Sequence, residues 1–220
     1  MGTLMNNIKA VIFDLDNTLI DRQRAFTEML KRKLPQILEP SRHSEINQMI
    51  EDILKWDANG TVSRYQCFST FIKEYHVTSI TAEELDQGWS KESGSTAYLF
   101  DDVIDTLIAL RPKYKLAILS NGNSSSQRRK LATINIDHLM DYTLVSGEFG
   151  VNKPDPLIFQ HVAAQLAVEP HECVYIGDNY QIDVLGSKNA GMQSIYIDRY
   201  NQPQKDTLTI HHIKELLNYL

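Results

Sequence analysis

Residues 8–18 read IKAVIFDLDNT. A short apolar run ends here in a group of polar residues that contains Asp14 and Asp16. Such a run, without polar alternation, is typical of a buried strand in a parallel sheet. Ligands bind at the carboxyl ends of these strands, so the two carboxylates stand where a site is expected. Taken alone, a turn or a helix cap explains the same residues equally well.

Three more predicted strands along the chain are also followed by polar residues. They are 115–120 (KLAILS) with Ser120 and Asn121, 142–146 (YTLVS) with Lys153, and 173–177 (CVYIG) with Asp178 and Asp183. Each group has an ordinary explanation as a strand-to-helix turn, a solvated lysine or a helix cap. Four unrelated turns would have to imitate one site in chain order, so we favour a common site.

The order of the predicted elements indicates the fold. A fifth strand is predicted at 193–198, and helical segments separate the strands from residue 101 onward, with a last helix in the tail. Strands that alternate with helices predict a parallel sheet with helices on both faces, a Rossmann-like α/β core.

Residues 22–96 show helical periodicity throughout. In Ile46, Met49, Ile50 and Ile53, for example, apolar residues recur three and four positions apart. Because this block lies between the first and second strands, we predict two domains. Residues 1–19 and 97–220 would form the α/β core, and residues 20–96 would form a helical insertion that folds beside it.

The predicted carboxylate cluster has a chemical consequence. Asp14, Asp178 and Asp183 would carry like charges within a few ångströms, and such groups stay ionised together only with a cation. Ligands that are all oxygen select a hard ion, and Mg²⁺ takes a few carboxylates, keeps waters and shares substrate phosphate. Lys153 would then act as a point charge beside a phosphoryl group.

Charge and composition exclude some partners. The chain of 220 residues has a net charge of −6, which argues against nucleic-acid polymers. No apolar run is long enough to span a membrane. Cys67 and Cys173 form no C-x-x-C pair, so we expect buried free thiols in a reducing compartment, the cytoplasm. A small phosphorylated metabolite remains a possible ligand, because a bound cation inverts the local charge. The oligomeric state is left open.

The four motifs together resemble those of the haloacid dehalogenase-like (HAD) superfamily. Asp14-x-Asp16-x-Thr18 is similar to its first motif and Ser120-Asn121 to its second. Lys153-Pro154 resembles the third motif, and Gly177-Asp178 with Asp183 the fourth. The resemblance covers the whole chain, since the helical block stands at the position of the family's cap domain. Four motifs in order are specific for the superfamily and poorly specific for substrate.

The resemblance implies a mechanism for phosphate ester hydrolysis. Asp14 would attack phosphorus and form an aspartyl-phosphate. Asp16 would protonate the leaving oxygen and then deprotonate the attacking water, with Thr18 orienting it by a hydrogen bond.

The resemblance also implies a cofactor and a binding site for the phosphoryl group. Mg²⁺ would bind the Asp14 side chain, the Asp16 backbone carbonyl and Asp178, with Asp183 close by or bound through water. The residues that would hold the phosphoryl oxygens are Ser120, Asn121 through its N–H, Lys153 and Thr18.

Several alternatives differ in substrate or in chemistry. Asp16 disfavours dehalogenation, because a leaving halide needs no proton. A sugar phosphomutase keeps the same acids and stays open, as does a phospho-accepting or silent binding protein on this fold. Asn17 and the SNG and KPDP forms of the motifs favour a nucleoside monophosphate or sugar phosphate. Arg22 and Arg24 are weak candidates for substrate contacts, since a solvated helix face explains them better.

Overall fold

The computed structural model describes residues 7–92, 94–200 and 206–220. The polypeptide separates into two compact units, Met1–Asp21 with Leu99–Leu220, and Arg22–Tyr98. The first unit contains a parallel six-stranded sheet, and the second is helical. No helix among the described residues is long and apolar enough to cross a membrane.

The sheet has the order β3-β2-β1-β4-β5-β6 and all its neighbours pair in parallel. Its strands are β1 (Ala10–Phe13), β2 (Lys115–Ser120), β3 (Tyr142–Val145), β4 (Cys173–Gly177), β5 (Gln193–Ile197) and β6 (Thr209–Ile210). The five predicted strands and the Rossmann-like α/β class are confirmed. The edge strand β6 was not predicted, because two residues are too short to show a pattern.

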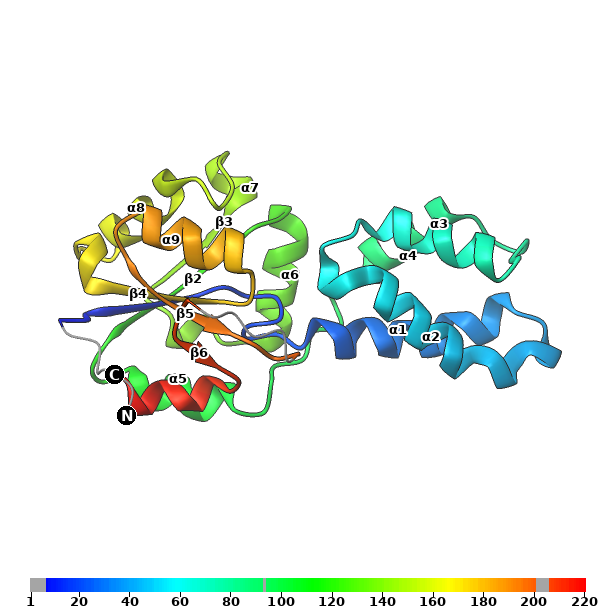
Figure 1. The fold of residues 1–220 in the computed structure, drawn as a ribbon, viewed down its shortest axis with the longest axis horizontal. Helices are drawn as coiled ribbons and strands as arrows, with labels where there is room; N and C mark the ends of the chain where they lie inside the picture. The colour runs from blue at the N-terminus through cyan, green and yellow to red at the C-terminus, as the bar shows by residue number, and fades with distance from the viewer. Residues whose placement is uncertain (1–6, 93, 201–205) are drawn as a thin grey trace. The chain divides into compact units, whose positions relative to one another are not determined.

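Helices cover both faces of the sheet, with α8 and α9 on one face and α5 on the other (Figure 1). The α-helices of this unit are α5 (Val103–Leu110), α6 (Ser124–Ile134), α7 (Ser146–Phe149), α8 (Pro156–Gln165) and α9 (Gly186–Asn189). A π-helix, η5 (Tyr180–Leu185), leads into α9, and short 3₁₀ helices are η3 (Asp137–Leu139), η4 (Pro170–Glu172) and η6 (Ile213–Asn218). The predicted tail helix is therefore the 3₁₀ helix η6.

Apolar contacts explain why the sheet forms around β1. All four β1 residues are fully buried, as expected for a central strand covered on both faces. Phe159 of α8 packs edge-on against Tyr175 of β4, with ring centroids 5.1 Å apart. Asp155 caps α8 by accepting a hydrogen bond from the Leu157 N–H at 2.9 Å, as its place before Pro156 predicts.

The helical unit has its own core. Its helices are α1 (Arg22–Ile37), α2 (Ile46–Asp57), α3 (Arg64–Glu74) and α4 (Ala82–Glu92), with the 3₁₀ turns η1 (Pro40–Glu45) and η2 (Ala58–Gly60). Phe26, Phe68 and Phe71 are fully buried in it. A capping box opens α4, because Thr81 and Glu84 each accept the other's backbone N–H.

Candidate active site

The register of the sheet brings the predicted motifs to one edge. Phe13 pairs with Ile118 on one side and with Ile176 on the other, so the residues after β1, β2 and β4 emerge together. The strands β2 and β3 lie on one side of β1, and β4 to β6 lie on the other. Open α/β sheets bind ligands at such a switch point.

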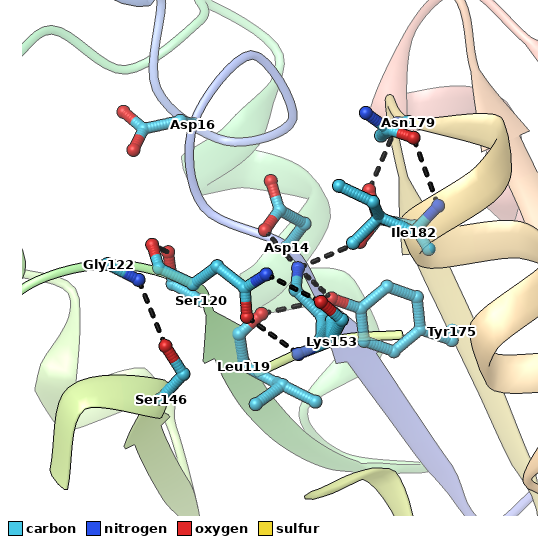
Figure 2. Close-up of polar contacts among 12 residues, drawn as sticks. Asp14, Asp16, Leu119, Ser120, Gly122, Ser146, Lys153, Tyr175, Asn179 and Ile182 are labelled. Atoms are coloured by element: carbon cyan, nitrogen blue, oxygen red, sulfur yellow. Dashed lines mark hydrogen bonds and ion pairs between the residues drawn. The ribbon is translucent and has the colours of Figure 1, made fainter. Parts of the chain in front are cut away.

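Lys153 contacts three buried polar groups at this edge of the sheet. Its Nζ donates to Asp14 Oδ1 at 2.6 Å and to the Tyr175 hydroxyl at 2.8 Å (Figure 2). It also donates to Asp183 Oδ1 at 2.8 Å. The ammonium therefore uses all three of its protons in contacts with buried groups. Burial lowers the pKa of Lys153, but the charges of Asp14 and Asp183 outweigh it and hold that pKa well above its usual value.

Three carboxylates meet beside this lysine. Asp14, Asp178 and Asp183 each offer an oxygen, and these oxygens lie within 4.8 Å of one another. Burial raises the pKa of Asp14 to about 7, against the opposing charge of Lys153. Burial also raises the pKa of Asp178 well above its usual range, and the charges of Asp14 and Asp183 add to the effect. Asp14 and Asp178 therefore hold protons more readily than isolated aspartates, and a bound cation would oppose this.

The residues present suit a hard divalent cation. Every donor of the cluster is an oxygen, which favours Mg²⁺ over softer metals. Three carboxylates against one ammonium leave two negative charges, which one divalent ion would balance. Asp183 Oδ2 accepts the Asn179 N–H at 3.0 Å, so this carboxylate is held in place from its own loop.

The second loop of the site connects β2 to α6, and Ser120 and Asn121 lie where it begins. The Asn121 side chain accepts the Lys153 N–H at 2.9 Å and donates to the Lys153 carbonyl at 3.0 Å, which fixes the backbone of that lysine. Ser120 is buried at the end of β2, and its Oγ accepts a hydrogen bond from Gln127 at 2.7 Å. The Gly122 N–H donates to Ser146 Oγ at 3.0 Å, which joins this loop to α7 (Figure 2).

Asp16 lies apart from the cluster and contacts α6 instead. Its carboxylate accepts hydrogen bonds from Lys130 Nζ at 2.7 and 2.8 Å and from Gln127 Nε2 at 2.9 Å. The predicted hydrogen bond from Thr18 to Asp16 is wrong. The buried Thr18 hydroxyl has no hydrogen-bond partner among the described residues, because the Asp16 carboxylate turns toward α6.

Sequence reasoning missed three residues of this site: Tyr175, Gln127 and Lys130. Tyr175 lies inside an apolar strand, so its sequence context indicates a core residue. Burial raises the pKa of Tyr175 well above its usual value, so the side chain stays a phenol. Its hydroxyl donates to the Leu119 carbonyl at 2.9 Å. Gln127 and Lys130 are three apart on α6, hence on one helix face. That spacing was the available signal in the sequence, but it does not show that the two side chains contact Asp16.

The two candidate arginines belong to the helical unit. Arg22 pairs with the buried Asp57, with 2.8 Å between Nη1 and Oδ2. The guanidinium of Arg24 stacks over the Tyr98 ring at 4.3 Å from its centroid. Both side chains therefore have structural contacts within the helical unit.

A Rossmann-like parallel sheet with this order of motifs defines a class of α/β hydrolases. The sequence matches the profile of the haloacid dehalogenase-like hydrolase family over residues 8–191. This match spans most of the chain, which therefore belongs to the haloacid dehalogenase-like hydrolases. The predicted family and the predicted enzymatic nature are confirmed.

Two similar proteins are named as phosphatases. A glyceraldehyde 3-phosphate phosphatase of Methanopyrus kandleri is 28% identical over 200 residues, which cover 87% of this chain and 84% of that protein. The N-acylneuraminate-9-phosphatase of Mus musculus is 28% identical over 205 residues, covering 86% and 82%. A HAD-hydrolase structure from Bacillus subtilis, bound to magnesium, shares the fold with a TM-score of 0.74, 21% identity and 96% and 97% coverage.

Proposed function

We propose that this enzyme is a Mg²⁺-dependent phosphomonoesterase that acts on a small phosphorylated metabolite through an aspartyl-phosphate on Asp14. The observation that carries the proposal is the cluster of Asp14, Asp178 and Asp183 around Lys153, in which carboxylate oxygens lie within 4.8 Å of one another. An acidic pocket of this kind attracts an anion only once a cation occupies it.

The first step transfers the phosphoryl group to the enzyme. An Asp14 carboxylate oxygen attacks phosphorus, the bond to the leaving oxygen breaks, and Asp16 supplies the proton to that oxygen. In the second step Asp16 accepts a proton from water, whose oxygen attacks phosphorus and releases Asp14 and inorganic phosphate. Bound Mg²⁺ supplies charge neutralisation for the phosphoryl oxygens.

Lys153 and the second loop bind the phosphoryl group in this scheme. The Lys153 ammonium stays charged and already lies 2.6 Å from the nucleophile Asp14, so it is placed to contact a transferred phosphoryl oxygen. Ser120, Asn121 and Thr18 complete the proposed phosphoryl-binding set. Thr18 contributes a buried hydroxyl that has no partner among the described residues.

The relatives narrow the proposed substrate class. Glyceraldehyde 3-phosphate and N-acylneuraminate 9-phosphate are both phosphates of a primary alcohol on a hydroxylated carbon chain. We therefore favour sugar phosphates over nucleoside monophosphates. We also propose that the helical unit, Arg22–Tyr98, acts as the cap that selects the leaving group. Cys67 and Cys173 are buried free thiols, and we propose a cytoplasmic location on that ground.

The test is phosphate release from 4-nitrophenyl phosphate and from a panel of sugar and nucleoside phosphates, with Mg²⁺ or with EDTA. We expect turnover with Mg²⁺ and a loss of at least about 10³-fold with EDTA or in Asp14→Asn. EDTA removes the cation that neutralises the phosphoryl oxygens, and Asp14→Asn removes the nucleophile. Turnover that survives Asp14→Asn would disprove the mechanism. Formation of an isomeric sugar phosphate without phosphate release would identify a phosphomutase instead.

A further inference from the structure

The Asp16 carboxylate is held by two side chains of α6. Lys130 Nζ lies 2.8 Å from Oδ1 and 2.7 Å from Oδ2, and Gln127 Nε2 lies 2.9 Å from Oδ2. The Lys130 and Asp16 side chains are 13% and 24% exposed, so water competes only weakly for this ion pair. Three donor contacts on one carboxylate restrict its orientation.

Gln127 also connects this carboxylate to the second loop. Its side chain is buried, and the same Nε2 lies 2.7 Å from Ser120 Oγ and 3.2 Å from the Asn121 carbonyl. The amide group thus joins the loop after β1 to the loop after β2. Asp16, Ser120 and α6 form one connected polar network in the core unit.

The direction of Asp16 fits the geometry of phosphoryl transfer. Figure 2 shows its carboxylate extending away from the carboxylate of Asp14. In an in-line displacement the leaving oxygen departs on the side of phosphorus opposite to the nucleophile. An acid that serves this oxygen must therefore be held apart from Asp14, and the contacts with Lys130 and Gln127 do so.

We infer that Lys130 and Gln127 are positioning residues for Asp16, and that the enzyme depends on them for esters with poor leaving groups. The inference rests on the proposed function. An alkoxide leaves only when it receives a proton, so proton delivery from a correctly oriented Asp16 limits the cleavage of alkyl and sugar phosphates. A nitrophenolate is stable without a proton, so its release needs this orientation much less.

The inference is tested by comparing leaving groups in Lys130→Met. The measured quantity is kcat/KM for 4-nitrophenyl phosphate and for the sugar phosphate that the wild type hydrolyses best. We expect kcat/KM to fall about 10- to 100-fold for the sugar phosphate and less than about threefold for the aryl ester. The ratio of the two values does not depend on the fraction of folded enzyme, so a merely structural effect leaves it unchanged.

Two further variants complete the design. Lys130→Arg keeps a cation that can donate to both carboxylate oxygens, so we expect it to recover most of the loss. Arg129→Met removes a neighbouring exposed cation of the same helix and should leave the ratio at its wild-type value. Equal losses on both esters, no loss on either, or a gain in Lys130→Met would overturn the inference. Failure of the proposed function is seen separately, as turnover that survives Asp14→Asn.

Discussion

Gly177, the last residue of β4, makes room for a carboxylate of the site. A Cβ on this residue would lie 2.4 Å from both Cγ and Oδ2 of Asp183. The Asp183 side chain has little freedom to move, since it is buried and accepts hydrogen bonds from Lys153 and from the Asn179 N–H. At the scale of single residues, one absent methyl group allows Asp183 to approach the strand end.

We predict that Gly177→Ala impairs both the site and the fold. The added methyl group displaces Asp183, so the Mg²⁺ concentration for half-maximal turnover should rise, and the free energy of unfolding should fall by about 1–3 kcal/mol. Mg²⁺ titrations of activity and urea unfolding measure the two effects.

Gly88, inside helix α4, provides the matched control. A Cβ there meets nothing within 4 Å, so Gly88→Ala should raise the free energy of unfolding by about 0.5–1 kcal/mol and leave the Mg²⁺ dependence unchanged. Equal Mg²⁺ dependence in the wild type and Gly177→Ala would contradict the steric argument.

At the scale of elements, an ion pair joins α6 to α7. Arg128 of α6 donates to both Glu148 oxygens at 2.8 Å, and Ser124 Oγ donates to Oε1 at 2.7 Å. The hydrogen bonds from Arg128, with help from Ser124, lower the pKa of Glu148 from 4.5 to about 2. The pair thus holds the helix that carries Gln127 and Lys130.

The depressed pKa of Glu148 predicts a pH-dependent contribution to stability. Above pH 4.5 the carboxylate is ionised in the folded and unfolded chains alike, and its contribution is fully present. The contribution is lost as the pH falls from 4.5 toward 2, because protons then bind the unfolded chain first.

Comparison with Glu148→Gln isolates this contribution, since the other acids titrate in both proteins. By urea unfolding, the wild type should exceed the variant by about 0.5–1 kcal/mol at pH 6. The difference should shrink steadily as the pH is lowered from 4.5 to 2.5. A difference that grows toward low pH would show the opposite sign of the shift.

At the scale of the whole molecule, each unit has a cluster of buried apolar residues of its own. One combines the sheet with α8 and includes Ile12, Tyr175 and Phe159. The other lies within the four helices of Arg22–Tyr98 and includes Phe68 and Phe71. Each unit therefore has the apolar core that a domain needs to unfold as a local unit.

We predict that core substitutions act within their own unit. Phe71→Leu should cost about 1–2 kcal/mol and raise amide hydrogen exchange in α1 to α4, with β1 to β5 unaffected. The reciprocal variant Phe159→Leu should raise exchange in the sheet and α8. Exchange that rises equally in both units after either substitution would show that they unfold as one.

Local sequence patterns were sufficient to predict most of the fold. Five strands, the helical block and the caps at Thr81 and Asp155 all follow from periodicity and from local hydrogen-bond chemistry, which act over a few residues. The two-residue strand β6 escaped prediction because it forms only by pairing with β5. Its signal lies in the partner and not in its own sequence.

For this protein, the sequence by itself determined the parallel α/β class, the family and the polar residues that end each strand. Alternating apolar runs and turn residues encode these features locally. The tertiary structure alone decided three contacts. The Tyr175 hydroxyl accepts a hydrogen bond from Lys153, the Asp16 carboxylate pairs with Lys130 of α6, and Thr18 makes no hydrogen bond to Asp16. These outcomes depend on side-chain orientations and on contacts between residues far apart in the chain, such as Asp16 and Lys130, which are 114 positions apart. Packing of the complete fold selects them.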